Sequence, residues 1–375
     1  MFEMKRFALS SLNQRRWKNF KSNRRAYYSL LIFIFFTLIA SMAEFIANDK
    51  PLAVNYRGNI IFPILSGIVT EDQFGGDEGL IVQYNDPAIQ CLIKTGGFID
   101  CYDEPEVIME ELDKVLINHP DLSIGWLVWP IIPYSFNTIN HDVVPAPGSP
   151  DKNHWLGTDD TTRDVLARVI YGFRISVGFA VVVVFVSSII GIIAGAAMGY
   201  FGGWIDLIFQ RIVEIWANIP SLYIIIIMSA IFSMSFSLLT ILVALFSWTA
   251  LVGVVRAEFL RARNFEYVRA ARALGLSNSK IIFRHVLPNA MVATVTMLPF
   301  LFTGAIGALT SLDFLGFGLP PSYPSLGELA LQAKQNLHAP WLAFTAFVVI
   351  SVMLSLLVFI FEGVRDAFDP RKTFS

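Results

Sequence analysis

Long apolar runs separated by polar stretches dominate this sequence. A helix needs about 20 apolar residues to cross the hydrocarbon core of a bilayer. Six runs meet that length: residues 27–47, 177–198, 212–233, 238–255, 290–309 and 341–361. Two others, 60–69 and 124–134, are too short, so we expect them to be core or interfacial segments. We therefore predict an all-α polytopic membrane protein with six transmembrane helices, here called spans one to six.

Composition supports the bilayer as solvent. Of the 375 residues, 55% are hydrophobic and only 15% are charged, and the mean hydropathy is +0.58. A soluble globular domain carries about 25% charged residues. The shortfall lies in the long uncharged runs, which excludes an ordinary soluble enzyme.

Span one is open to a second interpretation, because the segment Ala40-Ser-Met-Ala43 contains the small-x-small pattern of a signal-peptide cleavage site. The apolar run is longer than the 7–15 residues of a signal peptide, and this favours an uncleaved span. In the leader, Trp17 and Phe20 lie three apart among basic residues. This spacing suits a helix in the membrane surface, and an unstructured basic tail is the alternative.

Charge is sorted along the chain and predicts its orientation. The leader 1–26 carries eight bases and one acid, whereas residues 47–170 carry 19 acids and 7 bases. Because positive charge near span ends marks the cytoplasmic side, both termini and the basic loop 256–289 are predicted to be cytoplasmic. Arg163, Arg168 and Arg174, on the outer side of span two, contradict this rule. We expect four parts: leader 1–26, span one at 27–47, a large extracytoplasmic insertion at 48–153, and a five-helix core at 154–375.

Two cysteines, Cys91 and Cys101, lie symmetrically about Gly96 in the insertion. A hairpin with a short glycine-containing loop would place them opposite each other, and an outer compartment would preserve a disulfide. Two unpaired thiols are the alternative.

Catalytic and cofactor motifs are missing from the sequence. There is no Gly-Lys dipeptide, so the phosphate-binding loop of ATPases is absent, and the five histidines are not spaced as metal ligands. Glu44 and Glu214 lie close to span ends, and Glu214 is three residues from Arg211, so it is expected to be interfacial. We predict no catalytic residue, no metal and no bound cofactor.

The strongest signal is the loop between spans four and five. Asn264 can cap a short helix that holds Glu266 in its first turn, and Gly275 can end it in a left-handed cap. Three alanines, 270, 271 and 273, would give this helix a small, smooth face. Ser277 can cap a second helix, which Pro288 would separate from span five. The pattern predicts a helix-turn-helix that faces a partner, or else a solvated basic loop that anchors topology.

At these residues the chain resembles the permease subunits of ABC importers. Ala270, Ala271, Gly275, Leu287 and Pro288 stand in register with the cytoplasmic signature of that family, while Arg269 replaces its Glu and His285 takes a hydrophobic place. The resemblance implies that Arg269–Gly275 is a coupling helix seated in a groove of the ATPase subunit. The implied coupling residues are Glu266, Arg269, Ala270, Ala271, Gly275, His285, Leu287 and Pro288.

Further motifs are similar to the dipeptide and oligopeptide branch of the family. They are His154–Asp159, Arg163–Ser176, Gly199–Asp206, Ser311–Pro320 and Pro324–Gly327. The acidic insertion and the C-terminal segment Asp366–Pro370 resemble the corresponding parts of microcin C-type peptide permeases.

The resemblance implies a bacterial inner-membrane subunit that forms half of a translocation pore and works by alternating access. The implied partners are a second, related permease, two ATPase subunits that bind ATP, an extracytoplasmic solute-binding protein and membrane lipid, but no nucleic acid. The substrate class stays open among peptides, peptide-like antibiotics, nickel complexes and glutathione. Rival functions are an ion-coupled secondary transporter, which would carry membrane-embedded acids or half-helices, and a sensor or scaffold, which would carry a cytoplasmic signalling domain.

Span two carries a small residue at every fourth position: Ser187, Gly191, Gly195 and Gly199. Such a face permits close helix approach, either within the chain or between subunits. In span three, Pro220 is expected to cause a kink.

Overall fold

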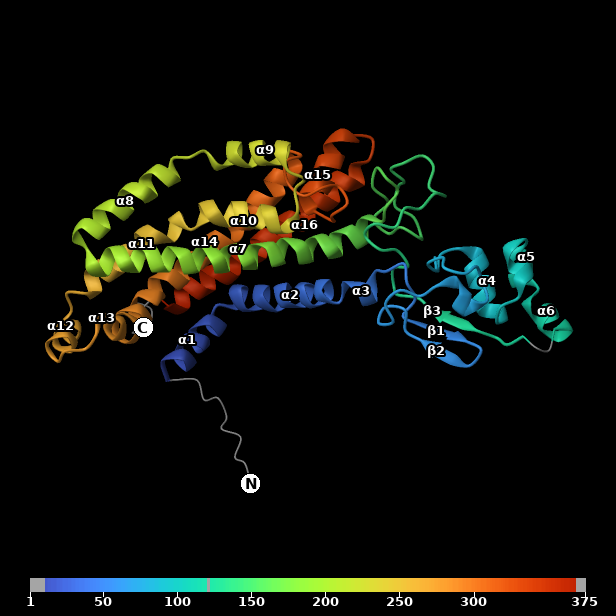
Figure 1. The fold of residues 1–375 in the computed structure, drawn as a ribbon, viewed down its shortest axis with the longest axis horizontal. Coiled ribbons are helices and arrows are strands. Elements are labelled where there is room, and N and C mark those ends of the chain that lie inside the picture. The colour runs from blue at the N-terminus through green and yellow to red at the C-terminus, as the bar shows by residue number, and fades with distance from the viewer. Residues whose placement is uncertain (1–10, 120–121, 369–375) are drawn as a thin grey trace, which may run out of the picture. The chain divides into compact units, whose positions relative to one another are not determined.

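The computed structural model describes residues 11–119 and 122–368 as two compact units. Unit 1 comprises residues 11–37, 172–335 and 343–368 of the described chain, and unit 2 comprises Leu38–Tyr171 and Asn336–Leu342. Helices α2, α7 and α16, labelled in Figure 1, each have residues in both units.

The long helices carry the hydrophobic runs. They are α2 Arg24–Ser41, α7 Val165–Phe201, α8 Gly203–Ala217, α9 Ser221–Ile231, α10 Phe236–Ser247, α11 Thr249–Ala262, α14 Leu287–Phe314 and α16 Pro340–Phe368. The shorter helices are α1 Ser11–Ser22, α3 Ala43–Ile46, α4 Pro87–Thr95, α5 Pro105–Glu110, α6 Leu112–Asn118, α12 Glu266–Ala273, α13 Asn278–Ile281 and α15 Leu326–Gln335. Two 3-10 helices, η1 Glu71–Phe74 and η2 Ile99–Tyr102, and a π-helix, η3 Ile282–Val286, complete the helical elements. The strands are β1 Ala53–Tyr56, β2 Asn59–Ile61 and β3 Trp126–Val128.

Six spans are confirmed when the bent pair α8 and α9 is counted as one. Five further helical segments are long and apolar enough to cross a membrane: 24–41, 165–201, 236–262, 278–314 and 340–368. Most are longer than the apolar runs that predicted them. At most 44% of the residues in any of their apolar windows are buried within the chain. The exposed apolar faces are those that lipid or partner subunits cover.

The kink expected at Pro220 is present. Helices α8 and α9 meet at 63°, with Pro220 directly before the first residue of α9. Proline lacks the N–H that would continue the helical hydrogen bonds. The break therefore follows from the sequence.

The small-residue face of α7 packs inside this chain, against α10 and α11. The Ser187 hydroxyl donates a hydrogen bond of 3.3 Å to the Ala244 carbonyl. A Cβ added at Gly191 would lie 2.8 Å from the Trp248 carbonyl oxygen, and one at Gly195 would lie 2.8 Å from that of Val252. One at Gly199 would lie 2.5 Å from the Phe259 Cβ. Of the two predicted uses of this face, the structure shows internal packing.

The basic leader includes a helix, α1, which packs on the end of α16. Phe20 and Ala26 are buried with Ala367 in a small apolar cluster. The Arg16 guanidinium lies 4.4 Å from the centre of the Phe368 ring. Residues 1–10 lie outside the described residues.

Unit 2 contains a small antiparallel sheet in the order β2-β1-β3, which the all-α expectation did not include. Val54 pairs with Ile61 on one side and with Leu127 on the other. Helix α4 and both 3-10 helices contribute buried residues to the same core, among them Phe74 and Leu92.

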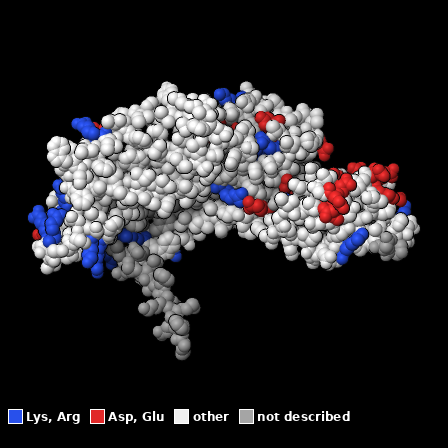
Figure 2. Space-filling view, in the orientation of Figure 1, with Lys and Arg blue, Asp and Glu red and all other residues white. Residues whose placement is uncertain are grey.

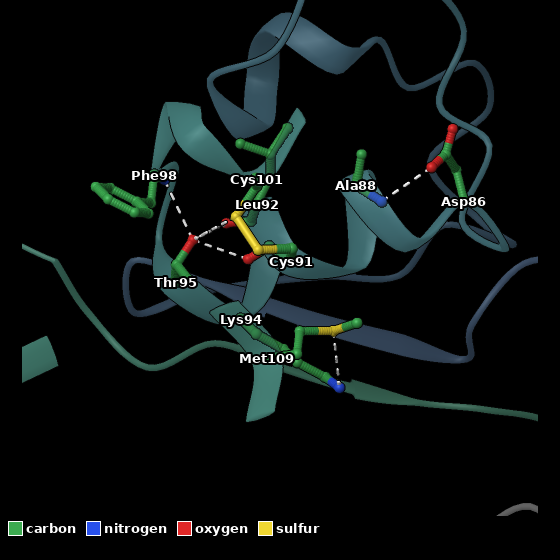
Figure 3. The surroundings of a disulfide bond; sticks show 9 residues. All are labelled: Asp86, Ala88, Cys91, Leu92, Lys94, Thr95, Phe98, Cys101 and Met109. Atoms are coloured by element: carbon green, nitrogen blue, oxygen red, sulfur yellow. Dashed lines mark hydrogen bonds between the residues drawn. A yellow bond between two sulfur atoms is a disulfide. The ribbon is translucent and has the colours of Figure 1, made fainter. Parts of the chain in front are cut away.

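Cys91 and Cys101 form a disulfide within this core, but the predicted hairpin is wrong (Figure 3). Cys91 lies on α4 and Cys101 on η2, with Cα atoms 5.6 Å apart. The segment is helical because Asp86 caps α4 by accepting a 2.9 Å hydrogen bond from the Ala88 N–H. Pro87 is placed in the first turn, and Gly96 ends the helix in a left-handed conformation.

Candidate coupling surface

The loop between spans four and five folds into helix α12, held against the ends of α7, α11 and α14. Val268 and Ala271, three residues apart on α12, are buried with Tyr200 of α7 and Phe259 of α11. Val286 and Ala290 close the same apolar cluster from η3 and α14. The buried face fixes α12 to three long helices, so displacement of α12 would be transmitted to them.

The opposite face of α12 is open to solvent and small. Ala270 and Ala273 are exposed there, together with Leu274, whose side chain is 79% exposed. The expectation that all three alanines share one face is wrong. Ala271 points into the cluster because it is three residues from Val268, one helical turn away.

Gly275 ends α12 as predicted, with a φ of 75°. The Leu276 N–H donates 3.2 Å to the Ala271 carbonyl and the Gly275 N–H donates 3.0 Å to that of Arg272, which together form a Schellman motif. A Cβ added at Gly275 would meet nothing within 4 Å, so the requirement for glycine is conformational.

The predicted caps at the other helix ends differ from those observed. Asn264 does not cap α12, because its amide donates back to the Leu260 carbonyl at 3.3 Å and the cap position belongs to Phe265. Ser277 occupies the cap position of α13, but its side chain makes no capping hydrogen bond among the described residues.

Pro288 does not separate the second helix from span five. The helix is continuous over 278–314. Five residues before Leu287 form the π-helix η3, which contains His285. A proline removes one backbone donor and crowds the preceding turn, and a wider turn upstream accommodates both. Leu287 is half-buried at the apolar cluster, while Pro288 is exposed.

Polar contacts that the sequence did not predict join the helices of this surface. The Tyr200 hydroxyl donates 2.9 Å to the Asn278 side-chain oxygen, and the Arg272 guanidinium lies 5.6 Å from the centre of the Tyr200 ring. The Asn289 amide donates to the Tyr267 hydroxyl at 3.1 Å and to the His285 carbonyl at 3.0 Å. Tyr200 lies in the Gly199–Asp206 motif, which was the available signal.

That motif also joins the start of α8 to α11. The Arg256 guanidinium donates two hydrogen bonds to Asp206, Nε to Oδ1 at 2.6 Å and Nη2 to Oδ2 at 2.8 Å. Bidentate pairs of this kind fix geometry as well as charge. The Arg263 guanidinium reaches the Gly199 carbonyl at 3.4 Å, at the turn between α7 and α8. Span three is thereby tied to α11, and the end of α7 is tied to the loop that precedes α12.

Basic residues gather at this end of unit 1 (Figure 2). They come from α11, the turn after it, α12, α13 and η3: Arg256, Arg261, Arg263, Arg269, Arg272, Lys280 and Arg284. Glu266 is exposed in the first turn of α12, where a negative charge is favoured. Arg269 is exposed and forms no ion pair with the described residues. The arrangement suits a partner surface that carries carboxylates.

One buried acid, Asp313 near the end of α14, was missed because it lies beyond the predicted run 290–309. Its Oδ1 accepts a 2.7 Å hydrogen bond from the Leu319 N–H, and its Oδ2 accepts one from the Ser325 hydroxyl. Both contacts shape the loop between α14 and α15. The carboxylate is engaged in structure, so it offers no specific support for ion coupling.

The motif before α7 forms a buried polar network in unit 2. His154 Nδ1 lies 2.9 Å from Asp164 Oδ2, Arg163 donates 2.8 Å to Asp159, and Arg168 Nε lies 3.4 Å from Asp159. All five side chains are buried. Such pairs fix one arrangement of the chain where it leads into α7. Among the described residues, no group of acids, histidines and cysteines could hold a metal ion.

Comparison with known proteins identifies the family. The family model described as "Binding-protein-dependent transport system inner membrane component" matches residues 187–374, which is half of the chain. The chain belongs to this family. A second model, "N-terminal TM domain of oligopeptide transport permease C", matches residues 11–62, so neither model covers residues 63–186.

Two relatives of this permease family align along the whole chain. The peptidoglycan transport system permease protein YejE of Agrobacterium fabrum is 48% identical, over 99% of this chain and 96% of its own length. The inner membrane ABC transporter permease protein YejE of Escherichia coli is 47% identical, over 97% of this chain and 98% of its own. The oligopeptide transport system permease protein OppC of Lactococcus lactis is 36% identical, over 58% of this chain and 76% of its own.

Among solved structures, the methionine ABC transporter MetNI in an inward-facing conformation is similar, with a TM-score of 0.46 and 18% identity. The match covers 54% of this chain and 96% of that one.

The family is one of multi-pass inner-membrane permease subunits rather than enzymes. A permease of this family works with ATPase subunits and a second permease.

Proposed function

We propose that this permease imports peptides or peptide-like compounds and forms half of the translocation pore with a second, related permease. The proposal is supported by the relatives, whose names refer to peptidoglycan, oligopeptide and inner-membrane ABC transport. A solute-binding protein would deliver the cargo to the outer face. ATP would bind to the partner ATPase subunits and not to this chain.

The observation that carries the coupling role is the division of α12 into two faces. One face is buried against α7, α11 and α14, and the other presents Ala270, Ala273 and Leu274 to solvent. Small residues allow close approach of another surface, and an exposed leucine can fill a pocket in it. A groove of the ATPase would seat this face, and Arg269 would face an acidic residue of the groove.

The way in which α12 is held supports an alternating-access mechanism in this proposal. When the ATPase subunits close, the force on α12 passes through the buried cluster into α7, α11 and α14, and through the Arg256–Asp206 pair into α8. The spans would then reorient together. In this proposal α12 and both termini face the cytoplasm, and residues 48–153 lie outside.

Substitution of Leu274 tests the coupling face. Leu274→Asp places a charge at the exposed tip of α12, so we expect the ATPase subunits to be lost from the purified complex and ATP-driven peptide uptake in proteoliposomes to fall with them. Leu337→Asp is the matched control, because Leu337 is 85% exposed and lies between α15 and α16. Normal assembly and uptake by the Leu274 variant would refute the coupling role.

A further inference from the structure

A cleft of about 550 Å³ opens in unit 2, within the size range of small-ligand sites. One wall comes from the chain around the start of α4, and the other from residues 129–142, which follow β3. The second wall is tied to the end of span one. The Ile132 N–H donates 2.9 Å to the Ile46 carbonyl, and the Asn48 N–H donates 3.1 Å to the Ile132 carbonyl. The cleft therefore adjoins the place where the chain leaves span one.

Aromatic, amide and acidic side chains line this cleft. Trp129 and Tyr134 provide ring surfaces, Asn85 and Gln90 provide amides, and Asp142 provides a carboxylate. None of its lining residues is a lysine or an arginine. Asp49 lies close by, since its carboxylate accepts a 3.0 Å hydrogen bond from the Thr138 hydroxyl, which also lines the cleft. The site is therefore negative and carries no cation of its own.

Several of these groups retain free hydrogen-bonding capacity. Within the described part of the chain, no hydrogen bond engages the Trp129 indole N–H, the Tyr134 hydroxyl or the Asp142 carboxylate. Gln90 uses its amide N–H to bond the Tyr84 carbonyl at 3.0 Å, which leaves its oxygen as an acceptor. The nearby His154 network differs, because its side chains already have partners. They bond one another, and His154 also lies 3.1 Å from the Asn140 amide and stacks on the Tyr134 ring at 4.5 Å at the edge of the cleft. Polar groups left open in a cleft are those that a ligand can satisfy.

The electrostatic setting favours a cationic ligand group. Burial, followed by the negative charges of Asp164, Asp151 and Asp142, raises the pKa of the Tyr134 hydroxyl above its ordinary value. The hydroxyl thus stays protonated and can donate. The same carboxylates that disfavour a phenolate would attract an ammonium group.

We propose that this cleft binds the amino-terminal end of a short peptide. The ammonium group would pair with Asp142, the main-chain amides would bond Asn85 and Gln90, and a side chain would pack on Trp129. This inference rests on the proposed import of peptides. It adds that the permease itself holds a cargo subsite next to the end of span one, and that a free amino terminus is the recognised feature.

Direct binding tests the subsite. The permease, purified with its co-expressed partner subunits in nanodiscs and without binding protein, is titrated with a tripeptide labelled at its carboxyl end. The N-acetylated tripeptide is the second probe. We expect the free-amine peptide to bind more tightly by roughly fivefold, the effect of a partly exposed ion pair, and Asp142→Asn to abolish that preference. Trp129→Ala should weaken both peptides.

Matched controls lie in the same unit. Asp103→Asn removes an exposed acid and Trp126→Ala an exposed tryptophan, and neither residue lines the cleft. Both variants should bind as the parent does. Equal binding of the two peptides by the parent, no binding at all, or an unchanged preference in Asp142→Asn would overturn the subsite. ATP-driven uptake that persists in such a case would leave the proposed function standing, whereas loss of uptake with intact peptide binding would count against the function alone.

Discussion

At the residue scale, Gly275 ends α12 in a backbone conformation that few other residues adopt. Its φ of 75° lies in the left-handed region, where a residue other than glycine, asparagine or aspartate raises the conformational free energy by about 1–2 kcal/mol. No neighbouring atom would obstruct a Cβ, so the whole cost is in the backbone.

Gly275→Val should therefore disturb the end of α12 without affecting insertion into the membrane. A penalty of 1–2 kcal/mol lowers the population of the seated helix roughly 5- to 30-fold. We expect ATP hydrolysis by the complex to continue while uptake in proteoliposomes falls. Gly275→Asn is the control, because asparagine tolerates the left-handed conformation, and its uptake should stay near that of the parent. Equal uptake by the two variants would show that the turn is not required.

At position 195 glycine is required because there is no space for a side chain, and not because of its backbone conformation. An added Cβ would lie 2.8 Å from both the Val252 carbonyl oxygen and the Val255 Cβ, so Gly195→Ala should separate α7 from α11. Overpacking of this kind costs about 1–3 kcal/mol. We expect a lower temperature of thermal unfolding in nanodiscs. Gly178→Ala, on the same helix with nothing within 4 Å, should be neutral or slightly stabilising. A similar loss in both variants would mean that the close approach of α7 to α11 at Gly195 does not set the effect.

Some residue roles could be predicted from the sequence and others could not. The roles of Gly275 and of the small residues at every fourth position of α7 could be predicted, because glycine has few other uses at a helix end or on a close-packed face. Asn264 was predicted to cap α12, but the cap position belongs to the next residue, Phe265, which makes no side-chain capping hydrogen bond. The direction in which Ala271 points depends on which face of α12 packs against α7. Tertiary packing sets that face, so the sequence alone did not predict it.

At the element scale, the segment 86–102 was predicted to be a hairpin but contains helix α4 and the 3-10 helix η2. Symmetry of the two cysteines about Gly96 suggested two strands, yet Asp86 followed by Pro87 is a start signal for a helix, and Gly96 is a stop signal. These signals were in the sequence and outweigh the symmetry.

The disulfide within this segment predicts a stable, thiol-free unit. Closing a loop of sequence separation 10 stabilises the folded state by about 2–3 kcal/mol. Alkylation of the purified protein under denaturing conditions should therefore modify no cysteine until a reductant is added. Cys91→Ala with Cys101→Ala should make residues 48–153 more sensitive to trypsin in nanodiscs. Modification of both thiols without reductant would contradict the pairing.

At the scale of the whole molecule, the six spans and their order follow from hydropathy, because lipid requires each crossing to be long and apolar. Unit 2 does not follow in this way. Its sheet pairs β1 with β3, about 70 residues apart, and the short apolar runs at 60–69 and 124–134 supply both edge strands. Long-range pairing of short strands leaves little periodic signal in a single sequence.

The predicted orientation depends on how the arginines around the start of α7 are counted. Arg163 and Arg168 contradict a cytoplasmic α12 as long as they are treated as free charges. In the structure both are buried, and both lie against Asp159, at 2.8 Å and 3.4 Å. Arginines used in this way offer little free positive charge to hold their side of the membrane in the cytoplasm. Arg174 remains on the outer side, but the leader and the loop 256–289 retain more exposed bases, so the rule still predicts a cytoplasmic α12.

Labelling of introduced cysteines decides this question directly, since the native cysteines are paired. Ser149 and Ser279 are both exposed, the first in unit 2 and the second on α13. In spheroplasts, a membrane-impermeant maleimide should label Ser149→Cys at once and Ser279→Cys only after the membrane is permeabilised. The reverse pattern would place α12 on the outer side, away from any cytoplasmic ATPase. Coupling through α12 would then be impossible, however well its exposed face suits a groove.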